Sequence, residues 1–224
     1  MKEIFVLIPA YNPDNRLNQL IEYLKMYVQN IIVVNDGSNN NFDFDGLSVK
    51  TLTHPINLGK GAALKTGFKY IIDNFSDCKG VVTADCDLQH SIEDIMKIFN
   101  ALEANPSSLH LGCRNFSKTN TPLRSFIGNI LMSKFMKLIH NMNLSDTQTG
   151  LRGIPANFIK HIIKIKVSDF SFETLMLIEA VKCKIQIVET PIETIYINNN
   201  SHSHFNPIID SCKIIKTLIR TNND

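Results

Sequence analysis

Two aspartates stand one residue apart at the end of an apolar run in the stretch "VVTADCDLQH", residues 81–90. Asp85 and Asp87 repel each other unless a cation lies between them. Hard divalent cations such as Mg²⁺ and Mn²⁺ take carboxylate oxygens as ligands, and Gln89 offers one more oxygen two residues further on. The alternative is a helix-entry turn, because acidic residues and Ser91 also suit a helix N-terminus. Metal binding is favoured over the helix-entry turn if the fold brings other polar clusters next to this one.

A second stretch suits phosphate chemistry. In "NLGKGAALKTG", residues 57–67, Gly59 and Gly61 permit close backbone approach, while Lys60 and Lys65 supply positive charge. The spacing is neither that of a P-loop nor GxGxxG. A helix N-terminus of this kind can still face a diphosphate. Equally, the small residues can serve only to pack the helix tightly against a sheet.

Short apolar runs alternate with helical patterns in the first half of the chain. Strands are predicted at 4–8, 31–34, 80–84 and 109–112, and helices at about 14–28, 60–73 and 91–103. This alternation is typical of βαβ units and predicts an α/β fold, with a mostly parallel sheet and helices on both faces. The second half predicts a helix at 123–141, a polar turn at 144–153, a helix at 172–182, a strand pair near 185–197 and a last helix.

Polar clusters follow the first three predicted strands: "PAYN" (9–12), "NDGS" (35–38) and "DCD" (85–87). The carboxyl ends of parallel strands meet at one edge of a sheet, and ligands bind there. We therefore expect these three clusters to converge on one cleft.

Composition narrows the class of protein. A chain of 224 residues suits a single domain, and 23 Lys and Arg against 21 Asp and Glu give no support for a nucleic-acid partner. Five cysteines without a CxxC argue against a disulfide framework or a structural zinc site, which favours the reducing cytoplasm. No apolar run approaches the roughly 20 residues that span a bilayer, and no signal-peptide pattern opens the chain. A cytoplasmic protein, at most peripheral to a membrane, is expected.

Six motifs occur in a characteristic order: "IPAYN", "VVNDGS", "NLGKGAALKTG", "TADCDLQH", "LGCRNF" and "DTQTGLRG". Together they resemble family 2 glycosyltransferases, in the branch of dolichol-phosphate mannosyltransferase and the bacterial polyprenyl-phosphate glycosyltransferases. The resemblance covers roughly the whole chain. It implies a single GT-A domain, a UDP- or GDP-linked sugar donor, a divalent cation and inversion at the anomeric carbon. Residues 1–113 would bind the nucleotide sugar, and residues 114–224, with the C-terminal helix, the acceptor.

The same resemblance implies residue roles. Pro9, Tyr11 and Asp36 would hold the base and ribose, and Asp85, Asp87 and Gln89 the metal and diphosphate. Arg114 and Arg124 would hold an acceptor phosphate, while Gln148 and Arg152 would line the same cleft. The full set expected at the donor is Pro9, Ala10, Tyr11, Asn12, Asn35, Asp36, Gly37, Asn57, Gly59, Lys60, Asp85, Cys86 and Asp87.

The acceptor decides whether a general base is needed. A lipid phosphate is already anionic near pH 7, and arginine matches its oxygens bidentately. An acceptor hydroxyl calls instead for a carboxylate base, for which Glu173 in "FSFET" is the candidate, unless it is an ordinary first-turn helix residue. The residues assigned to catalysis are Asp87, Arg114, Arg124, Gln148, Arg152 and Glu173.

The chain departs from the family pattern at three places. Pro13 stands where an acidic residue is usual, Asn35 replaces the first Asp of "DDGS", and "GCR" replaces "GSR". The tail "NSHSHFNPIIDS" resembles a segment that folds over the donor site in some bacterial relatives. It makes His204 a further candidate metal ligand, although loop histidines are more often exposed to solvent.

Two helices combine apolar and basic residues, the one from Leu123 and the last one. Such helices can rest on an anionic membrane surface or pack on a core with a solvated basic face. Peripheral membrane contact, direct or through a membrane partner, is expected from the lipid acceptor.

The sequence thus predicts an inverting, metal-dependent enzyme that moves a hexose to a polyprenyl phosphate. One alternative acceptor is a hydroxyl of a glycan, lipid or cell-wall polymer. A catalytically silent nucleotide-sugar-binding subunit is the alternative outside enzymes. The intact Asp85, Asp87 and Arg114 argue against that last alternative.

Overall fold

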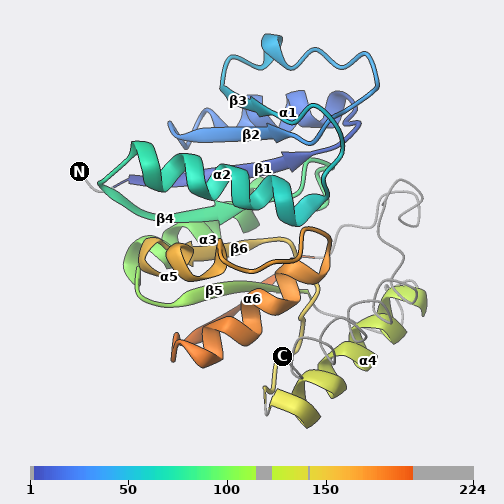
Figure 1. Cartoon of the computed structure of the whole chain (residues 1–224), viewed down its shortest axis with the longest axis vertical. Coiled ribbons are helices and arrows are strands. Elements are labelled where there is room, and N and C mark those ends of the chain that lie inside the picture. Colours follow the sequence, from blue (N-terminus) through green and yellow to red (C-terminus); the bar gives the residue numbers. More distant parts are fainter. Residues whose placement is uncertain (1–2, 115–122, 141, 194–224) are drawn as a thin grey trace.

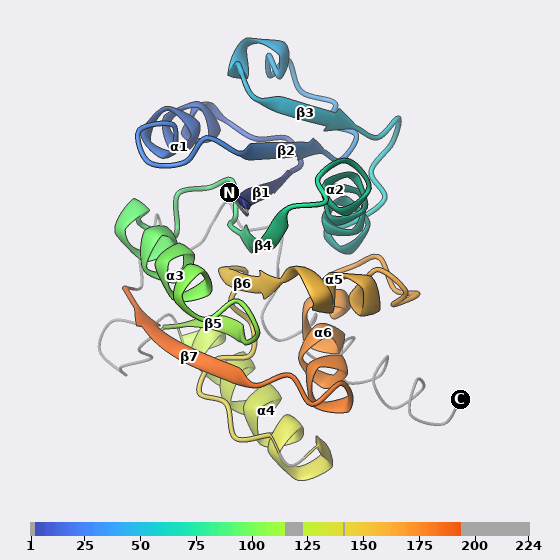
Figure 2. The same cartoon turned by 90° about the vertical axis from the view of Figure 1, so that its left-hand side faces the viewer.

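The computed structural model describes residues 3–114, 123–140 and 142–193, without the side chains of residues 123–127, 139 and 140. The described strands form one seven-stranded sheet in the order β3-β2-β1-β4-β6-β5-β7 (Figures 1 and 2). They are β1 (Glu3–Ala10), β2 (Ile31–Asn35), β3 (Lys50–Thr53), β4 (Cys78–Thr83), β5 (Leu109–Arg114), β6 (Arg152–Pro155) and β7 (Ile187–Ile192). The helices are α1 (Asn15–Leu24), α2 (Lys60–Asn74), α3 (Ile92–Ala104), α4 (Leu123–His140), α5 (Ala156–Ile162) and α6 (Ser171–Lys182), with a 3₁₀ turn at Asp45–Leu47.

The central strand β1 explains why helices cover both faces of the sheet. Its residues 4–10 are all buried, and side chains alternate between the two faces of a strand. Phe5 and Leu7 pack into one core with α2, α4, α5 and α6, whereas Val6 and Ile8 pack into the other with α1 and α3. Figure 2 shows α1 and α3 on one side of the sheet and α2, α5 and α6 on the other.

The predicted mostly parallel sheet is confirmed, with one addition. Among the described strands β6 alone runs antiparallel, between β4 and β5, pairing Gly153 with Val82 and Arg152 with Leu111. Neither β6 nor the edge strand β3 was predicted, because each has only four residues and lacks a clear apolar pattern. The helix α5 was missed as well, since it spans only seven residues.

The predicted helices agree with the structure to within a few residues. Ser91 caps α3 by accepting a hydrogen bond from the Asp94 backbone N–H at 3.1 Å. The first helix ends at Leu24 and not at Val28. Of the predicted strand pair near 185–197, β7 is described; the remainder and the last helix lie outside the described residues. No helix in the described part of the chain is long and apolar enough to span a bilayer.

This topology places the three polar clusters on one edge of the sheet, as predicted. The strands β1, β2 and β4 are parallel neighbours, so the segments that follow Ala10, Asn35 and Thr83 leave the same edge. Because β6 is antiparallel, it begins at that edge, and its Arg152 pairs with Thr83. The polar turn before β6 therefore reaches the same place.

Helices α2 and α6 meet close to this edge through a glycine. A Cβ atom on Gly61 would lie 2.6 Å from Cβ of Phe172 and 2.9 Å from the backbone oxygen of Asp169. The first turn of α2 can therefore contact the start of α6 only with glycine at this position. The small residues of "GKGAAL" thus have a packing role, one of the two alternatives left open by the sequence.

We expect Gly61→Ala to destabilise the protein. Overpacking of a filled contact costs about 1–3 kcal/mol, because both helices must shift. Urea denaturation should show a lower midpoint with an unchanged slope. Gly46→Ala is the control, since its Cβ would meet only the exposed side chain of Asp43. An unchanged midpoint for Gly61→Ala would contradict the close contact of the two helices.

Candidate active site

The loops after β1 and β2 are joined by hydrogen bonds. The backbone N–H of Asn12 donates to Ser38 Oγ at 2.9 Å, and Asn12 Oδ1 accepts from the backbone N–H of Asn39 at 2.9 Å. Asn35 Oδ1 accepts from the backbone N–H of Ser38, also at 2.9 Å. Two of the predicted donor residues, Asn12 and Asn35, therefore form one rigid corner of the site.

Asp36 is buried under the next loop. Its carboxylate accepts from the backbone N–H groups of Leu58 and Gly59 at 3.0 and 2.9 Å, and lies 2.7 Å from His54 Nδ1. The other ring nitrogen of His54 lies 2.9 Å from Thr66 Oγ1 in α2. Asp36 thus holds the loop 54–59 in place, a role that the family resemblance did not suggest.

The other predicted donor residues differ in exposure. Pro9 and Ala10 are buried within β1, Tyr11 and Cys86 are half-buried, and Asn57 is exposed. Gly37 and Gly59 have positive φ angles of 67° and 97°, which glycine adopts without strain.

Lys60 joins two carboxylates from distant parts of the chain. Its Nζ lies 2.7 Å from Asp85 Oδ1 and 3.0 Å from Glu173 Oε2. Burial lowers the pKa of Lys60, but the two carboxylates raise it by more, so the net pKa lies above the ordinary value. The ammonium group is therefore charged across the physiological pH range.

Asp85 is held from two sides. Burial raises its pKa, but Lys60 and His90 lower it by more, so the net pKa lies well below the ordinary value. His90 is buried, and its Nε2 lies 3.5 Å from Asp85 Oδ2. The backbone of Gly150 closes the remaining side, because a Cβ there would lie 2.5 Å from that oxygen. Asp85 is thus a fixed, ionised carboxylate.

Asp87 lies in a less favourable electrostatic environment. Burial raises its pKa, and the negative charge of Asp85 raises it further. Its Oδ1 accepts from the Gln89 backbone N–H at 3.1 Å, and its backbone oxygen accepts from Arg16 Nη1 at 3.3 Å. Between the two aspartates, burial raises the pKa of the Cys86 thiol to about 12, so this cysteine is a neutral thiol.

The oxygen donors at this turn fit a hard divalent cation. Two carboxylates leave the end of β4 within three residues, and their mutual repulsion contributes to the raised pKa of Asp87. A cation bound to both would relieve that repulsion. Asp85 and Asp87 would supply its carboxylate ligands, and the contribution of Gln89 stays a prediction.

Arg114, at the end of β5, is held by a buried carboxylate. Its Nε donates to Asp146 Oδ2 at 2.7 Å and its Nη2 donates to Oδ1 at 3.1 Å. Asp146 is fully buried and also accepts from the Gln148 backbone N–H at 3.0 Å. This bidentate pair fixes the plane of the guanidinium group.

Arg152 does not line the cleft as the resemblance implied. It is fully buried, and its guanidinium donates to the backbone oxygens of Thr147, Thr149 and Glu173. Burial lowers its pKa. The correct interpretation is a structural cation beneath the site, which ties the turn before β6 to the first turn of α6.

Of the remaining predicted catalytic residues, Glu173 and Gln148 are described, whereas the side chain of Arg124 is not. Glu173 is 8% exposed, and its Oε1 has no hydrogen-bond partner among the described residues. Gln148 is half-buried in the turn beside Arg114. The side chain of Arg124, on α4, and the whole of His204 fall outside the described residues.

Sequence reasoning missed three residues that organise the site: Asp146, His54 and His90. Asp146 stands in a quoted motif, yet nothing in the pattern distinguishes a buried acid from a turn aspartate. His54 follows β3, a strand that was itself not predicted. His90 directly follows the acidic turn, so its position next to Gln89 was the available signal.

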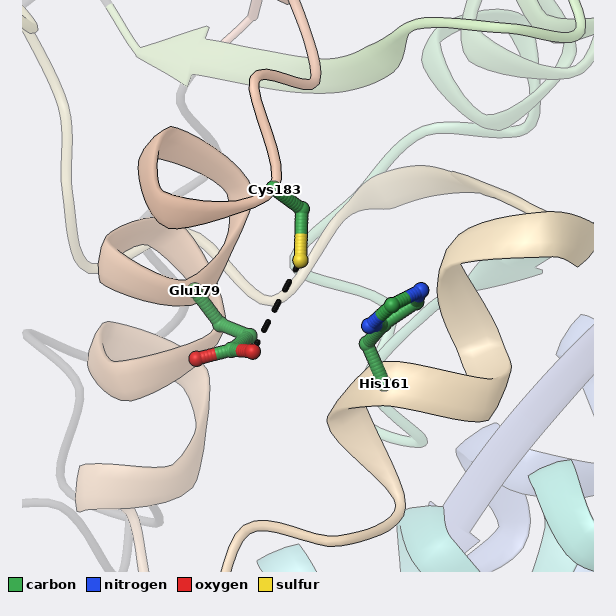
Figure 3. Close-up of side chains that lie close together, drawn as sticks. All are labelled: His161, Glu179 and Cys183. Atoms are coloured by element: carbon green, nitrogen blue, oxygen red, sulfur yellow. Dashed lines mark hydrogen bonds between the residues drawn. The ribbon is translucent and has the colours of Figure 1, made fainter.

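A second group of metal-ligating side chains lies at the opposite end of α6 from Glu173. His161, Glu179 and Cys183 offer ligand atoms within 4.8 Å of one another (Figure 3). The Cys183 thiol donates to Glu179 Oε1 at 3.6 Å, and burial and that carboxylate raise its pKa. This cluster is separate from the strand-end site.

The mostly parallel sheet with helices on both faces agrees with the GT-A fold that the sequence predicts. The chain belongs to glycosyltransferase family 2, because the model described as glycosyl transferase family 2 matches residues 5–162. The protein is therefore a glycosyltransferase, as predicted, and the alternative of a catalytically silent subunit is set aside.

Two curated relatives are named for dolichyl-phosphate substrates. The UDP-N-acetylglucosamine–dolichyl-phosphate N-acetylglucosaminyltransferase of Methanococcus voltae is 30% identical over 220 residues, covering 87% of this chain and 86% of its own. A dolichyl-phosphate beta-glucosyltransferase of Trichomonas vaginalis is 26% identical over 213 residues, covering 84% of this chain and 64% of its own.

A solved structure shares the fold. Glucosyl-3-phosphoglycerate synthase from Mycobacterium tuberculosis, in complex with Mn²⁺, UDP and phosphoglyceric acid, matches 98% of this chain and 78% of its own. The TM-score is 0.74 and the identity is 15%, so this likeness concerns the fold alone.

Replacing Asp87 with Asn should stabilise the metal-free protein at neutral pH. A raised pKa in the folded state means that the Asp87 carboxyl favours folding below its unfolded pKa and loses that contribution as pH rises. We expect a higher urea midpoint for Asp87→Asn at pH 7 in EDTA, with the difference vanishing below about pH 4. Asp45→Asn, in the exposed 3₁₀ turn, is the control. A lower midpoint at pH 7 would contradict the repulsion between the two aspartates.

Proposed function

We propose that this glycosyltransferase moves a hexose from a UDP- or GDP-linked sugar to a polyprenyl phosphate, such as dolichyl or undecaprenyl phosphate, with inversion. One observation carries the proposal. The turn 146–150 contacts the Arg114 guanidinium at one end, through Asp146, and the Asp85 carboxylate at the other, through Gly150. A cationic group suited to an acceptor phosphate is thereby fixed beside the acidic turn. The names of the two dolichyl-phosphate relatives support this acceptor.

The donor would bind at the ends of β1, β2 and β4. Asn12 and Asn35 would form the corner beside the nucleotide, and Lys60, the first residue of α2, would contact the diphosphate with its ammonium group. Asp85, Asp87 and Gln89 would hold Mg²⁺ or Mn²⁺, in line with the Mn²⁺ and UDP of the Mycobacterium structure. Such a cation neutralises the negative charge that develops on the departing diphosphate.

The reaction would form one bond and break one. An oxygen of the acceptor phosphate attacks the anomeric carbon while the bond from that carbon to the donor diphosphate breaks. The bonding electrons leave with the nucleoside diphosphate, and the configuration is inverted. No base is required, because the attacking oxygen is already anionic. Arg114, fixed by Asp146, orients the phosphate for this attack.

A hydroxyl acceptor is the second candidate, and Glu173 favours it. Its Oε1 is buried without a hydrogen-bond partner among the described residues, so it is placed to accept a proton. The Mycobacterium enzyme, named for glucosyl-3-phosphoglycerate, illustrates the fold with a small phosphorylated acceptor. Against this candidate, Lys60 already holds the other oxygen of Glu173 at 3.0 Å.

We place the reaction at the cytoplasmic face of a membrane, with peripheral contact or a membrane partner. Helix α4 supports this location, because Leu131 and Leu138 are exposed beside the exposed Lys134 and Lys137. Apolar and basic side chains together suit an anionic lipid surface. We further propose that residues 1–113 bind the donor and residues 114–224 the acceptor.

The phosphate acceptor is tested by matched lipids. UDP-glucose, UDP-N-acetylglucosamine and GDP-mannose, radiolabelled in the sugar, are each incubated with Mn²⁺ and either a short polyprenyl phosphate or the corresponding polyprenol. We expect lipid-extractable label with the phosphate alone. Arg114→Gln should raise the acceptor KM about 10- to 100-fold, for loss of a charged hydrogen bond worth about 1.5–3 kcal/mol.

The exposed Lys97→Gln provides the control for that assay, since Lys97 pairs with Asp94 on α3. Transfer to polyprenol, or an unchanged acceptor KM for Arg114→Gln, would overturn the phosphate acceptor.

Glu173→Gln distinguishes the two candidate functions. General-base catalysis contributes about 10²- to 10⁴-fold to a rate, so a hydroxyl-transferring enzyme should lose at least that much. With a phosphate acceptor we expect kcat to fall by less than about tenfold, because no proton needs to be removed. The comparison uses single-turnover rates at pH 7, with Glu179→Gln at the far end of α6 as the control. A loss above 10²-fold would favour the hydroxyl acceptor.

A further inference from the structure

Lys60 occupies a position that a divalent cation would also seek. Its ammonium lies 2.7 Å from Asp85 Oδ1 and 3.0 Å from Glu173 Oε2, with only 16% of the side chain exposed. We propose that Lys60 competes with the divalent cation for Asp85, so that the cation binds tightly only together with the donor diphosphate. This inference rests on the metal and donor of the proposed function and adds a coupling between them.

The Asp85 carboxylate cannot easily move away from Lys60. His90 Nε2 lies 3.5 Å from its second oxygen, and the Gly150 backbone leaves no room for a Cβ beside that oxygen. A carboxylate fixed in this way presents the same oxygens to every cation. The positive charge of Lys60 therefore opposes the approach of a second cation to Asp85.

The donor diphosphate would relieve the opposition. Lys60 is the first residue of α2. The backbone N–H groups of Gly59 and Ala62 already donate to the Asp36 carboxylate and to the Ser168 backbone oxygen, so the Lys60 ammonium is the group at this terminus that a diphosphate would contact. A diphosphate at this terminus offers Lys60 two negative groups, which draw its ammonium away from Asp85.

Binding of the two ligands is then coupled in both directions. If the diphosphate raises the affinity for the cation, the cation raises the affinity for the diphosphate by the same factor. Neither ligand needs to bind tightly alone. Binding of the metal without nucleotide is therefore weak, and the cation occupies the acidic turn only when the donor is also bound.

Lys65, one turn along the same helix, provides a matched control. Its Nζ donates to the backbone oxygens of Ile165 and Val167 at 3.0 and 2.8 Å. It therefore carries the same charge on the same helix, but it is held by backbone oxygens and not by Asp85 and Glu173.

The experiment measures Mn²⁺ binding by electron paramagnetic resonance of free Mn²⁺, without nucleotide and with saturating UDP or GDP. All proteins carry His161→Ala and Cys183→Ser, which remove the second group of ligands described above. In this parent we expect UDP or GDP to lower the Mn²⁺ Kd by at least about tenfold. Lys60→Met should lower the Mn²⁺ Kd about tenfold without nucleotide and reduce the nucleotide effect below about threefold. Lys65→Met should change neither value.

The outcomes separate this inference from the proposed function. If Lys60→Met binds Mn²⁺ no more tightly than the parent, or keeps the full nucleotide effect, the competition is wrong while the metal site stands. If the parent binds no Mn²⁺ with either nucleotide, the metal of the proposed function is overturned together with the inference. Lys60→Gln carries the same expectation and replaces Lys60→Met if that variant fails to fold.

Discussion

The contact of Lys60 with Asp85 and Glu173 is the interaction on which the site depends. It joins the start of α2, the end of β4 and the first turn of α6, segments that lie far apart in the sequence. Charges this deeply placed are tolerated only when they are paired, because unpaired burial costs several kcal/mol. The close packing at Gly61 brings the two helices near enough for the pairing to form. Fold and site are therefore linked by one partly buried cation.

Two arginines contact the turn before β6 in different ways. Arg152 is fully buried and donates to backbone oxygens of the turn before β6, so it stabilises that turn from below. Arg114 is partly exposed and is held from the side by Asp146. The Arg152 guanidinium thus holds the turn before β6, and Asp146 of that same turn holds the Arg114 guanidinium. Both arrangements require the antiparallel strand β6, which brings the turn between the ends of β4 and β5.

The acidic turn illustrates how a functional site can oppose stability. Asp85 is well paired and has a lowered pKa, whereas Asp87, two residues away, has a raised pKa because burial and Asp85 disfavour its charge. A protein selected for stability alone would not place an aspartate there. A divalent cation and a diphosphate bound at this turn would account for the arrangement. The diphosphate would also draw Lys60 away from Asp85 and make it a partner of the donor.

Local patterns in the sequence determined the βαβ organisation, most helix ends and the convergence of three polar clusters, because strand periodicity, helix caps and the direction of parallel strands are local properties. The motifs also determined the family. Only the tertiary structure decided the roles of Arg152, Asp36 and Asp146, since burial and pairing depend on which distant segments pack together. Arg152 and Arg114 are the same residue type in similar motifs. Arg152 is a fully buried structural cation and Arg114 is a partly exposed cation held by Asp146, because β6 inserts antiparallel between β4 and β5 and brings the turn before it to both residues. No local pattern in the sequence indicates that strand pairing.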